Sequence, residues 1–485
     1  MIIPVGLPEF VFSGKRVLVM NWRDINHPQA GGAEQYMHEI SRRWVDAGND
    51  ITWITGRHKS QSRMDIVDGL RVIRTGGPLS LYPRAALMLW RKRGTFDAVV
   101  DCQNGIPFFS PLFVRNGLPI VQVVHHVHQE QFRSRFSRPM AAFGRFLEGS
   151  LARWVYGPHA IAAVSPSTRT ELRRLGYDGP IFVVPNGTID VPNALGPRDP
   201  DPTITVVSRL VPHKRIDLLL GQVAVATRSI PRLKLEIVGD GPEKSRLQHI
   251  AADLGLEPTV TFHGYQSDAR RDNLLSRAWL TASTSASEGW GCSIIEAAAW
   301  GVPCLALRVP GIRDSVLDNR TGWLVDSAKD FGEALVASLE MLTNEVVAKQ
   351  VAASCQEWAR CFKWDRSAAL LAGVLAQEFS TGHRARGKPE WQGAPSDDSI
   401  LARFHLPNDV DLRSSLRPTD EFAKEGRTVL ALLNGYDWSD ALALMGRIGA
   451  VDAQLKQVNP RDMLGGPLGL SRGRRSADMT EVGPS

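Results

Sequence analysis

Residues 16–54 read RVLVMNWRDINHPQAGGAEQYMHEISRRWVDAGNDITWI and contain the pattern from which the fold class follows. RVLVM (16–20) and DITWI (50–54) are short runs rich in β-branched residues, typical of buried strands. Between them, AEQYMHEISRRWVDAG (33–48) has the apolar spacing of an amphipathic helix and ends at a glycine. A strand, a helix and a second strand in this order predict a parallel sheet with helical crossovers.

The same alternation continues along most of the chain. Further strands are expected at 96–100, 119–124, 160–164, 181–185, 204–208, 234–238, 259–263, 279–283 and 303–307. The segment TIDVPNALGPRDPDP (188–202) interrupts the alternation and is typical of a linker. We therefore expect an α/β protein with two Rossmann-like, doubly wound domains, at 1–190 and 200–365.

The last part of the chain has a different character. A terminal helix is expected within 355–379, and the domain division places it at 366–380. Beyond it, TGHRARGKPEWQGAPSDDSI (381–400) is polar and aperiodic, as a flexible connector is. Two helical patches are expected around 418–434 and 438–456. Residues 381–485 are thus predicted to be a linker and a partly helical or disordered tail.

Composition excludes several classes of protein. The chain has 485 residues, 43% apolar and 22% charged, with 57 Lys and Arg against 51 Asp and Glu. It contains no apolar run long enough for a membrane span, and its five cysteines form no C-x-x-C pair. We expect reduced thiols and a cytoplasmic protein, and neither a secreted, a disulfide-rich nor an integral membrane protein. Residues 1–190 carry 23 basic and 15 acidic side chains, so the positive charge lies on the first domain.

The strongest chemical signal is SEGWGCSIIEAAAWGVP (287–303). Its glycines allow a tight turn, and the backbone N–H groups of Gly291, Cys292 and Ser293 would open a new helix that attracts an anion such as a pyrophosphate. Glu296 lies one turn further, suited to accept hydrogen bonds from a ribose diol. The alternative is that Glu288 and Glu296 are only a loop acid and a first-turn acid, which a helix dipole favours anyway.

This stretch resembles the E-x7-E signature of retaining glycosyltransferases of family 4. Other stretches resemble the family in the same order: GGAEQYMHEISRRWVDAGNDITWIT (31–55), VVHHVH (123–128), SPSTRTELRRLG (165–176), VVPNG (183–187), VVSRLVPHKRIDLLL (206–220) and LEIVGDGPEKSRL (235–247). The resemblance covers about residues 15–380. It implies the GT-B architecture of two facing Rossmann-like domains, with a C-terminal extension.

The resemblance also implies roles for individual residues. It assigns the diphosphate to Arg209 and Lys214, the ribose to Glu296 and the transferred sugar to Glu288. By the same resemblance, Gly31 and Gly32 form a loop that closes over the donor, Gly239 and Gly241 border the base pocket, and Gly291, Cys292 and Ser293 lie at the phosphates. No metal or other cofactor is implied, because the nucleotide sugar is a substrate. These assignments have purely structural alternatives. Arg209 and Lys214 could be ordinary surface cations, Gly31 and Gly32 a flexible helix cap, and Gly239 and Gly241 part of a common turn.

His125 follows the strand at 119–124, at the edge where open α/β sheets bind ligands. The resemblance makes it the histidine that contacts the donor sugar, and together with Glu288 it forms the predicted catalytic pair. Because His126 and His128 are so close, the register could differ by one residue. His126 and His128 would also suit two metal ligands, although no convincing third ligand follows, so hydrogen-bonded structural histidines are the main alternative.

The implied activity is retaining transfer of a hexose from a UDP- or GDP-linked donor to a hydroxyl acceptor. A GT-B epimerase and a non-catalytic binding partner remain alternatives, and nucleic-acid binding is not expected because no reading module is present. The chain also departs from the family at RVPGIRDSV (308–316), where a single Gly311 and Asp314 replace a Gly-Gly turn and a glutamate.

Residues 128–157 indicate what kind of acceptor the protein could use. They carry five arginines, two glutamates and interleaved phenylalanines. Such a segment can lie on an anionic membrane, or it can be the solvated face of a helix over an ordinary core. We hypothesise a lipid-linked or saccharide acceptor and peripheral contact with the inner face of a membrane.

Overall fold

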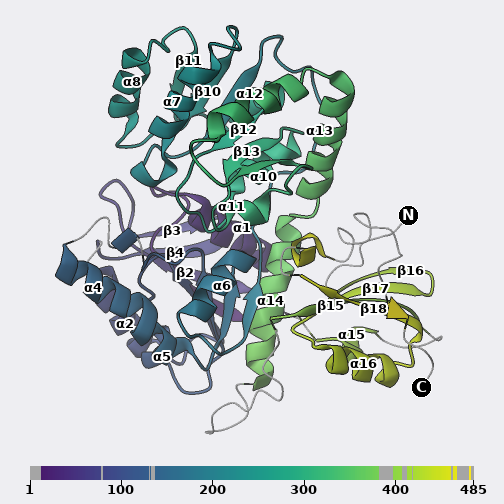
Figure 1. Cartoon of the computed structure of the whole chain (residues 1–485). Coiled ribbons are helices and arrows are strands. Elements are labelled where there is room, and N and C mark those ends of the chain that lie inside the picture. Colours follow the sequence, from purple (N-terminus) through teal and green to yellow (C-terminus); the bar gives the residue numbers. More distant parts are fainter. Residues whose placement is uncertain are drawn as a thin grey trace. The chain divides into compact units, whose positions relative to one another are not determined.

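Figure 1 shows the computed structural model of the chain, which describes residues 12–77, 80–129, 131–132, 137–381, 397–406, 412–417, 419–459, 462–466 and 480–481. Contacts divide the chain into two units. Unit 1 comprises Met1–Gly187 and Trp364–Ser485, and unit 2 comprises Thr188–Lys363. Each unit contains a parallel sheet flanked by helices, so the predicted pair of Rossmann-like α/β domains is confirmed.

The sheet of unit 1 has the strand order β3-β4-β2-β1-β5-β6-β7-β8. Its strands are β1 Arg16–Met20, β2 Asp50–Thr55, β3 Met64–Val67, β4 Leu70–Arg74, β5 Ala98–Gln103, β6 Ile120–Val124, β7 Ala160–Ala163 and β8 Ile181–Val183. All neighbours run parallel except β3 and β4. The central strands are largely continuous apolar runs because both of their faces are covered; in β1, Val17, Leu18 and Val19 are fully buried.

Helices cover this sheet. They are α1 Gly32–Asp46, α2 Leu81–Arg91, η1 Ser110–Leu112, α4 Arg138–Phe146, the wide turn η2 Leu147–Leu151, α5 Ala152–Tyr156, α6 Pro166–Arg174 and α14 Trp364–Thr381. The buried sides of α2 and α5 share one hydrophobic core with strands β1, β5, β6 and β7. α14 packs on α1, β6 and β7, so a helix that follows unit 2 in the sequence completes the first domain.

The sheet of unit 2 has the order β11-β10-β9 and, joined to β9 through a bridge between Ile204 and Leu280, β12-β13-β14. Its strands are β9 Thr203–Val207, β10 Lys234–Val238, β11 Val260–Gly264, β12 Thr281–Ser283, β13 Cys304–Leu307 and β14 Gly322–Val325. Its helices are η3 Pro212–Lys214, α7 Ile216–Ala226, α8 Lys244–Asp253, α9 Asp268–Arg277, α10 Cys292–Ala299, α11 Ile312–Ser315, α12 Phe331–Met341 and α13 Glu345–Ala359.

The expected helix at 355–379 is wrong as a single element. α13 ends at Ala359 and α14 begins at Trp364. Between them the backbone turns away, because Phe362 packs against Trp358 and Trp290, with ring centroids 4.8 and 5.2 Å apart, and accepts a hydrogen bond from the Thr188 N–H. The chain passes between the two units at this interruption and at Gly187.

Residues 399–465 form a compact α/β domain within unit 1. Its elements are β15 Ser399–His405, α15 Leu412–Ser415, β16 Glu421–Glu425, β17 Thr428–Asn434, α16 Trp438–Arg447, β18 Val451–Val458 and η4 Asp462–Gly465. They form an antiparallel sheet in the order β16-β17-β15-β18, with the short strand β19 Thr480–Glu481 beside β18. The succession βαββαβ with this strand order is the ferredoxin-like arrangement. We call residues 399–465 the C-terminal domain.

The helix expected around 418–434 is therefore wrong, and only the first half of the one expected at 438–456 is helical. Val429, Ala431 and Leu433 are fully buried and alternate along β17, which is the period of a strand. Gly426, with a φ of 58°, turns the chain between β16 and β17.

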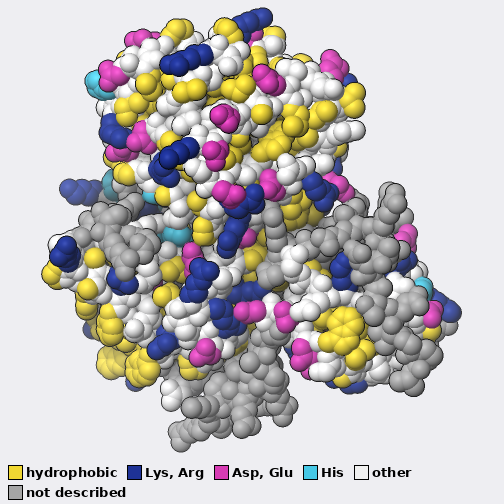
Figure 2. Space-filling view, in the orientation of Figure 1, with side chains coloured by type: hydrophobic (Ala, Val, Ile, Leu, Met, Phe, Trp, Pro, Cys, Tyr) yellow, Lys and Arg dark blue, Asp and Glu magenta, His cyan; other side chains and the backbone are white. Residues whose placement is uncertain are grey.

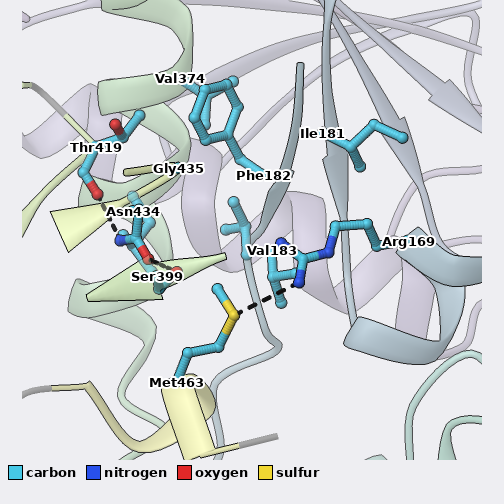
Figure 3. Close-up of a pocket in the computed structure, with 12 residues that line it drawn as sticks. Arg169, Ile181, Phe182, Val183, Val374, Ser399, Thr419, Asn434, Gly435 and Met463 are labelled. Atoms are coloured by element: carbon cyan, nitrogen blue, oxygen red, sulfur yellow. Dashed lines mark hydrogen bonds between the residues drawn. The ribbon is translucent and has the colours of Figure 1, made fainter. Parts of the chain in front are cut away.

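Arginines join the C-terminal domain to α6 and α14. Arg366 donates to both carboxylate oxygens of Glu421 over 2.6 and 3.0 Å, and Arg173 does the same with Asp397. Figure 3 shows the small cavity beside this contact, where the Arg169 Nη2 lies 3.9 Å from the Met463 sulfur. Its lining combines apolar side chains, among them Ile181, Phe182 and Val374, with the polar side chains of Ser399, Thr419 and Asn434.

Candidate active site

In unit 2, the loops that follow β9, β12 and β13 lie at the carboxyl edge of the sheet, where α/β proteins bind ligands. Lys214 ends the turn η3 after β9, and its Nζ donates to Oε1 of Glu288, after β12. The Ser285 hydroxyl donates to the same oxygen over 2.7 Å. The Lys214 and Glu288 side chains are 21% and 15% exposed, so the pair is sheltered yet reachable by a ligand.

Thr284 holds these two loops together. Its Oγ1 donates to the carbonyls of Arg215 and Lys214 over 2.8 and 3.2 Å. Arg215 has a φ of 51°, a left-handed conformation that turns the chain sharply into α7. Lys214 is therefore fixed by its backbone as well as by its ion pair with Glu288.

The predicted turn into α10 is present. Gly291 is the N-cap residue, and its carbonyl accepts from the Ile294 and Ile295 N–H groups over 3.0 and 3.1 Å. The N–H groups of Cys292 and Ser293 precede the first intrahelical bonds, the position that attracts anions. A Cβ on Gly291 would lie 2.5 Å from the Ser315 hydroxyl, so glycine is required for this close approach.

Glu296 lies in the second turn of α10 and is 9% exposed. Burial raises the pKa of its carboxyl to about 7, against the opposing charge of Arg271 on α9. Burial also raises the pKa of the Cys292 thiol to about 12, with smaller contributions from the charges of Glu296 and Glu288. Cys292 is therefore a protonated thiol at neutral pH.

The glycines after β10 allow it to pack against the loop that carries Arg209. Gly239 has a φ of 136°, and a Cβ there would lie 1.9 Å from the Ser208 carbonyl oxygen. A Cβ on Gly241 would lie 2.3 Å from that of Leu210. Arg209 itself is exposed, and among the described residues its guanidinium has no ion pair. The structure thus brings Lys214 and Glu288 into contact and leaves Arg209 unengaged.

In unit 1, His125 directly follows β6 and is 9% exposed. Its ring packs edge-on against Tyr36 of α1, with centroids 5.0 Å apart. Burial lowers the pKa of His125 to about 3, with a smaller contribution from His128. Its buried Nε2 has no hydrogen-bond partner among the residues that the structure describes. The imidazole is thus neutral at physiological pH.

His126 and His128 lie beside each other, with ring centroids 5.1 Å apart. The His128 N–H donates to Oε1 of Glu148 over 2.6 Å, and its ring Nδ1 is 3.4 Å from the same oxygen. Within the described part of the chain, no cluster of three or more His, Cys, Asp or Glu could hold a metal ion.

Gly31 and Gly32 begin α1. Gly31 is the N-cap residue, and its N–H donates to the Glu34 carboxylate over 2.7 Å. The preceding loop is anchored by Asp24, which accepts from Arg74 and, over 2.9 Å, from Gln61. The Asp24 and Arg74 side chains are each only 2% exposed. This buried pair, like Ser285, was not found from the sequence, because nothing in the sequence links residue 24 to residue 74.

Two family models match the chain. The model described as Glycosyltransferase Family 4 matches residues 30–190, and the one described as Glycosyl transferases group 1 matches residues 189–357. Together they span both Rossmann-like regions and stop before the C-terminal domain. No helix in the described ranges is long and apolar enough to cross a bilayer.

Several characterised proteins are similar in sequence. A GDP-mannose-dependent α-(1-6)-phosphatidylinositol monomannoside mannosyltransferase of Mycolicibacterium smegmatis is 28% identical over 49% of this chain and 74% of its own length. One subunit of the human phosphatidylinositol N-acetylglucosaminyltransferase is 23% identical over 66% of this chain and 68% of its own. A D-inositol 3-phosphate glycosyltransferase of Mycobacteroides abscessus is 31% identical over 47% of this chain and 50% of its own.

Solved structures show the same fold. Sucrose-phosphate synthase from Thermosynechococcus elongatus aligns with a TM-score of 0.64 at 19% identity, covering 76% of this chain and 99% of that one. Anabaena HepE in complex with UDP and glucose aligns with a TM-score of 0.58 at 19% identity, covering 75% of this chain and 100% of that one.

Two Rossmann-like units of the GT-B fold, matched in order by two glycosyltransferase models, define a sugar transferase. With both of its domain models matched in order, the chain belongs to the retaining glycosyltransferases of family 4. It is thus a hexosyltransferase that moves a sugar from a nucleoside diphosphate to a hydroxyl group.

Proposed function

We propose that unit 2 binds the nucleotide sugar around the Lys214–Glu288 pair, and that the acceptor hydroxyl belongs to a phosphate-bearing, lipid-linked molecule. The donor proposal is carried by one observation: Lys214, Ser285 and Glu288 converge at the start of α10. Around that point lie a cation, a hydroxyl, a carboxylate and a helix N-terminus. These are the groups that a sugar diphosphate needs.

The diphosphate is the leaving group, so the protein must stabilise the negative charge that develops on it. We assign this task to Lys214, Arg209 and the N–H groups of Cys292 and Ser293. Lys214 is held by Glu288 in the free protein and would turn its ammonium to the phosphate when the donor binds. Glu288 would then accept hydrogen bonds from hydroxyls of the transferred sugar. On this proposal the reaction requires no metal or other cofactor.

Retention of configuration follows if the acceptor attacks from the face that the diphosphate leaves, with a leaving-group oxygen taking the acceptor's proton. His125 fits this scheme as a neutral hydrogen-bonding group, because its low pKa excludes it as a proton donor at neutral pH. Its buried Nε2, which lacks a partner in the described part of the chain, would bind a hydroxyl of the reacting sugar. Glu296 would accept from the ribose diol.

Two observations support a phosphate-bearing acceptor. The three relatives named above act, by their names, on a phosphatidylinositol mannoside, on phosphatidylinositol and on an inositol phosphate. In unit 1, the loop after β2 exposes Arg57, His58 and Lys59 at the carboxyl edge of the sheet. Cations at this edge suit an anionic acceptor, and a lipid-linked acceptor would place the protein at a membrane surface.

Nucleotide titration of the full chain tests the donor site. UDP, GDP and their sugars are compared by calorimetry and thermal shift in wild type, Lys214→Ala, Glu296→Ala and the control Arg228→Ala, an exposed cation of unit 2. We expect the affinity to fall about 10- to 100-fold in the first two variants, as for a lost charge-assisted hydrogen bond, and to stay unchanged in the control. Unchanged binding in Lys214→Ala would overturn the assignment.

Turnover tests the transfer reaction directly. Incubation with the donor alone would convert it to another sugar nucleotide if the protein were an epimerase. A protein that binds donor and acceptor but forms no product would be a non-catalytic partner. We expect a glycosylated acceptor, detected by mass spectrometry, and no change in the donor sugar without the acceptor.

A further inference from the structure

Helices α2, α4 and α5 of unit 1 expose large apolar side chains. The exposed fractions are 46% for Leu87, 54% for Trp90, 58% for Met140, 58% for Phe143, 51% for Phe146 and 71% for Trp154. Met140, Phe143 and Phe146 recur every three residues along α4, a spacing that keeps side chains on one side of a helix. Single exposed apolar residues are ordinary, whereas a group of them marks an interaction site.

The three helices lie over the same face of the sheet. The buried sides of α2 and α5 belong to one core, in which Tyr82 of α2 contacts Phe108 and Tyr156 of α5 contacts Phe109. α4 continues into α5 through η2 without a break. Figure 1 draws the three helices together at the lower left, and Figure 2 shows hydrophobic and basic side chains there. We call this surface the α2–α4–α5 face.

The charged residues of this face are almost all basic. Its basic residues are Arg84, Arg91, Lys92, Arg93, Arg138, Arg145 and Arg153. Between residues 80 and 93, and between 137 and 157, the only acidic residue is Glu148, which is fully buried and binds the backbone of His128. Residues 80–93 and 137–157 therefore present cations around apolar side chains and no exposed carboxylate.

For residues 137–157, the exposure of the aromatic side chains distinguishes between the two interpretations of the basic segment, whereas residues 130 and 133–136 lie outside the described residues. If the phenylalanines packed on an ordinary core, they would be buried beneath a solvated basic face. Instead Phe143, Phe146 and Trp154 are each more than half exposed, whereas Val155 and Tyr156 fill the core. The aromatic and the basic side chains thus share one solvent-facing surface.

We infer that the α2–α4–α5 face docks onto an anionic lipid bilayer. Aromatic and aliphatic side chains would enter the region between headgroups and acyl chains, while the arginines bind lipid phosphates. A nucleic acid would pair with the arginines but leave Leu87, Met140 and Phe143 in water. This inference stands on the exposed side chains and does not require the proposed donor site.

Vesicle sedimentation of the full chain, without nucleotide or acceptor, is the test. We compare vesicles of phosphatidylcholine with vesicles that contain phosphatidylglycerol as well, at low and at physiological salt. We expect binding only to the anionic vesicles and a decrease with salt. Because each cation near the surface contributes about 1 kcal/mol, Arg84→Gln with Lys92→Gln should weaken binding about 30-fold. Arg228→Gln with Arg270→Gln, two exposed arginines of unit 2, is the matched control.

The apolar part of the face is tested in the same assay. Phe143→Ser with Trp154→Ser should weaken binding at least tenfold, whereas Tyr265→Ser, which removes an aromatic ring 84% exposed in unit 2, should leave it unchanged. Phospholipids with brominated acyl chains should quench tryptophan fluorescence, and Trp90→Phe with Trp154→Phe should abolish most of that quenching. Nucleotide binding should be unaffected in every variant, so failure here is separable from failure of the donor site.

Two results would overturn the inference. One is no retention of the wild type on anionic vesicles at low salt. The other is vesicle binding or quenching that the face variants leave unchanged. Self-association in sedimentation velocity, lost in Phe143→Ser with Trp154→Ser and accompanied by no vesicle binding, would instead identify the face as a protein–protein interface.

Discussion

His125 and Glu296, two ionisable residues assigned to the reaction, are both buried, and burial shifts their pKa values in opposite directions. The pKa falls to about 3 for the histidine and rises to about 7 for the glutamate, so burial favours the uncharged form of each. On the proposed assignment, His125 would contribute a hydrogen bond to the sugar without a fixed charge, and Glu296 would be only partly ionised near pH 7. At the residue scale, the charge around the diphosphate would then come from Lys214 and Arg209.

Replacing Glu296 should make stability depend less on pH. Its folded pKa lies above the ordinary value of 4.5, so the folded state binds the proton more tightly than the unfolded state. The contribution of Glu296 to stability is therefore greatest below pH 4.5, declines between pH 4.5 and about 7, and is constant above. Glu296→Gln should raise the free energy of unfolding by up to about 2–3 kcal/mol at pH 8 relative to pH 5.

Urea denaturation at the two pH values measures this difference. Glu257→Gln, at an exposed position of unit 2, is the control and should show none. An equal effect of Glu296→Gln at pH 5 and pH 8 would contradict the assignment of the buried carboxyl. The same variant should weaken nucleotide binding, because an amide replaces one of the two acceptor oxygens of the carboxylate with an NH2 donor, so the ribose diol loses one acceptor.

His125→Phe should separate chemistry from nucleotide binding. The phenylalanine preserves the edge-on contact with Tyr36 but removes Nε2, so we expect kcat to fall about 100-fold or more while the affinity for UDP or GDP is unchanged. Because His125 is neutral above pH 4, the wild-type pH–rate profile should contain no limb near pH 6.5 that disappears in the variant. Rates are measured by product formation over pH 5–9.

At the element scale, Gly239 shows how loop packing positions the donor site. Alanine there would need a left-handed φ of 136° and would place a Cβ 1.9 Å from the Ser208 carbonyl. Gly239→Ala should therefore destabilise the protein by about 2–4 kcal/mol and displace the loop of Arg209. Gly221→Ala, in the middle of α7 with no atom within 4 Å of the new Cβ, should instead stabilise by up to about 1 kcal/mol. Chemical denaturation of both variants measures the change in the free energy of unfolding, which should have opposite signs in the two.

The sequence predicted the parallel sheets well because their strands are buried on both faces and so form unbroken apolar runs. The prediction failed where buried and exposed residues alternate along a strand, or where the strand lies at the edge of a sheet. β3 and β4 form a hairpin around Asp68 and Gly69, both with positive φ, and an Asp-Gly pair is itself a hairpin signal. In the C-terminal domain, the alternation of Val429, Ala431 and Leu433 was mistaken for a helix.

The residues of the candidate site also fall into those that the sequence predicted and those that it did not. Lys214, Glu288 and Glu296 could be proposed from motifs, and the contact of Lys214 with Glu288 fits that proposal. Ser285 and the Asp24–Arg74 pair could not, since their importance comes from contacts between segments distant in sequence. No motif pointed to Trp90 or Leu87 either, because exposure is a property of the folded surface.

At the scale of the whole molecule, α14 connects parts of unit 1 that are far apart in sequence. The Ser367 hydroxyl donates to the carbonyl of Pro185 after β8 over 2.7 Å, and the Trp44 indole of α1 donates to the carbonyl of Ala368 over 3.0 Å. At Arg366 the same helix holds the C-terminal domain. The domain is thus attached to the turn of α14 that directly follows the crossover from unit 2.

Removing Arg366 should loosen the C-terminal domain selectively. Arg366 makes a two-pronged contact with Glu421, and its Nη1 donates to the carbonyl of Leu464 over 2.5 Å; the side chains of the pair are 17% and 9% exposed. Arg366→Ala leaves a poorly solvated carboxylate behind, at a cost of about 2–4 kcal/mol. Arg366→Lys keeps the charge but loses the planar fork, so its effect should be intermediate. The control is Arg403→Ala, which removes an exposed arginine of β15.

Hydrogen exchange distinguishes detachment from general destabilisation. If Arg366 fixes the domain, amides of β15 and β17 should exchange faster in Arg366→Ala, while those of β9 and β10 in unit 2 keep their protection. Equal loss of protection in β9 would mean that the arginine stabilises the chain as a whole, and unchanged exchange in β15 would mean that packing alone holds the domain. Because the ion pair bridges α14 and β16 directly, we expect the first pattern, with β16 the most affected strand.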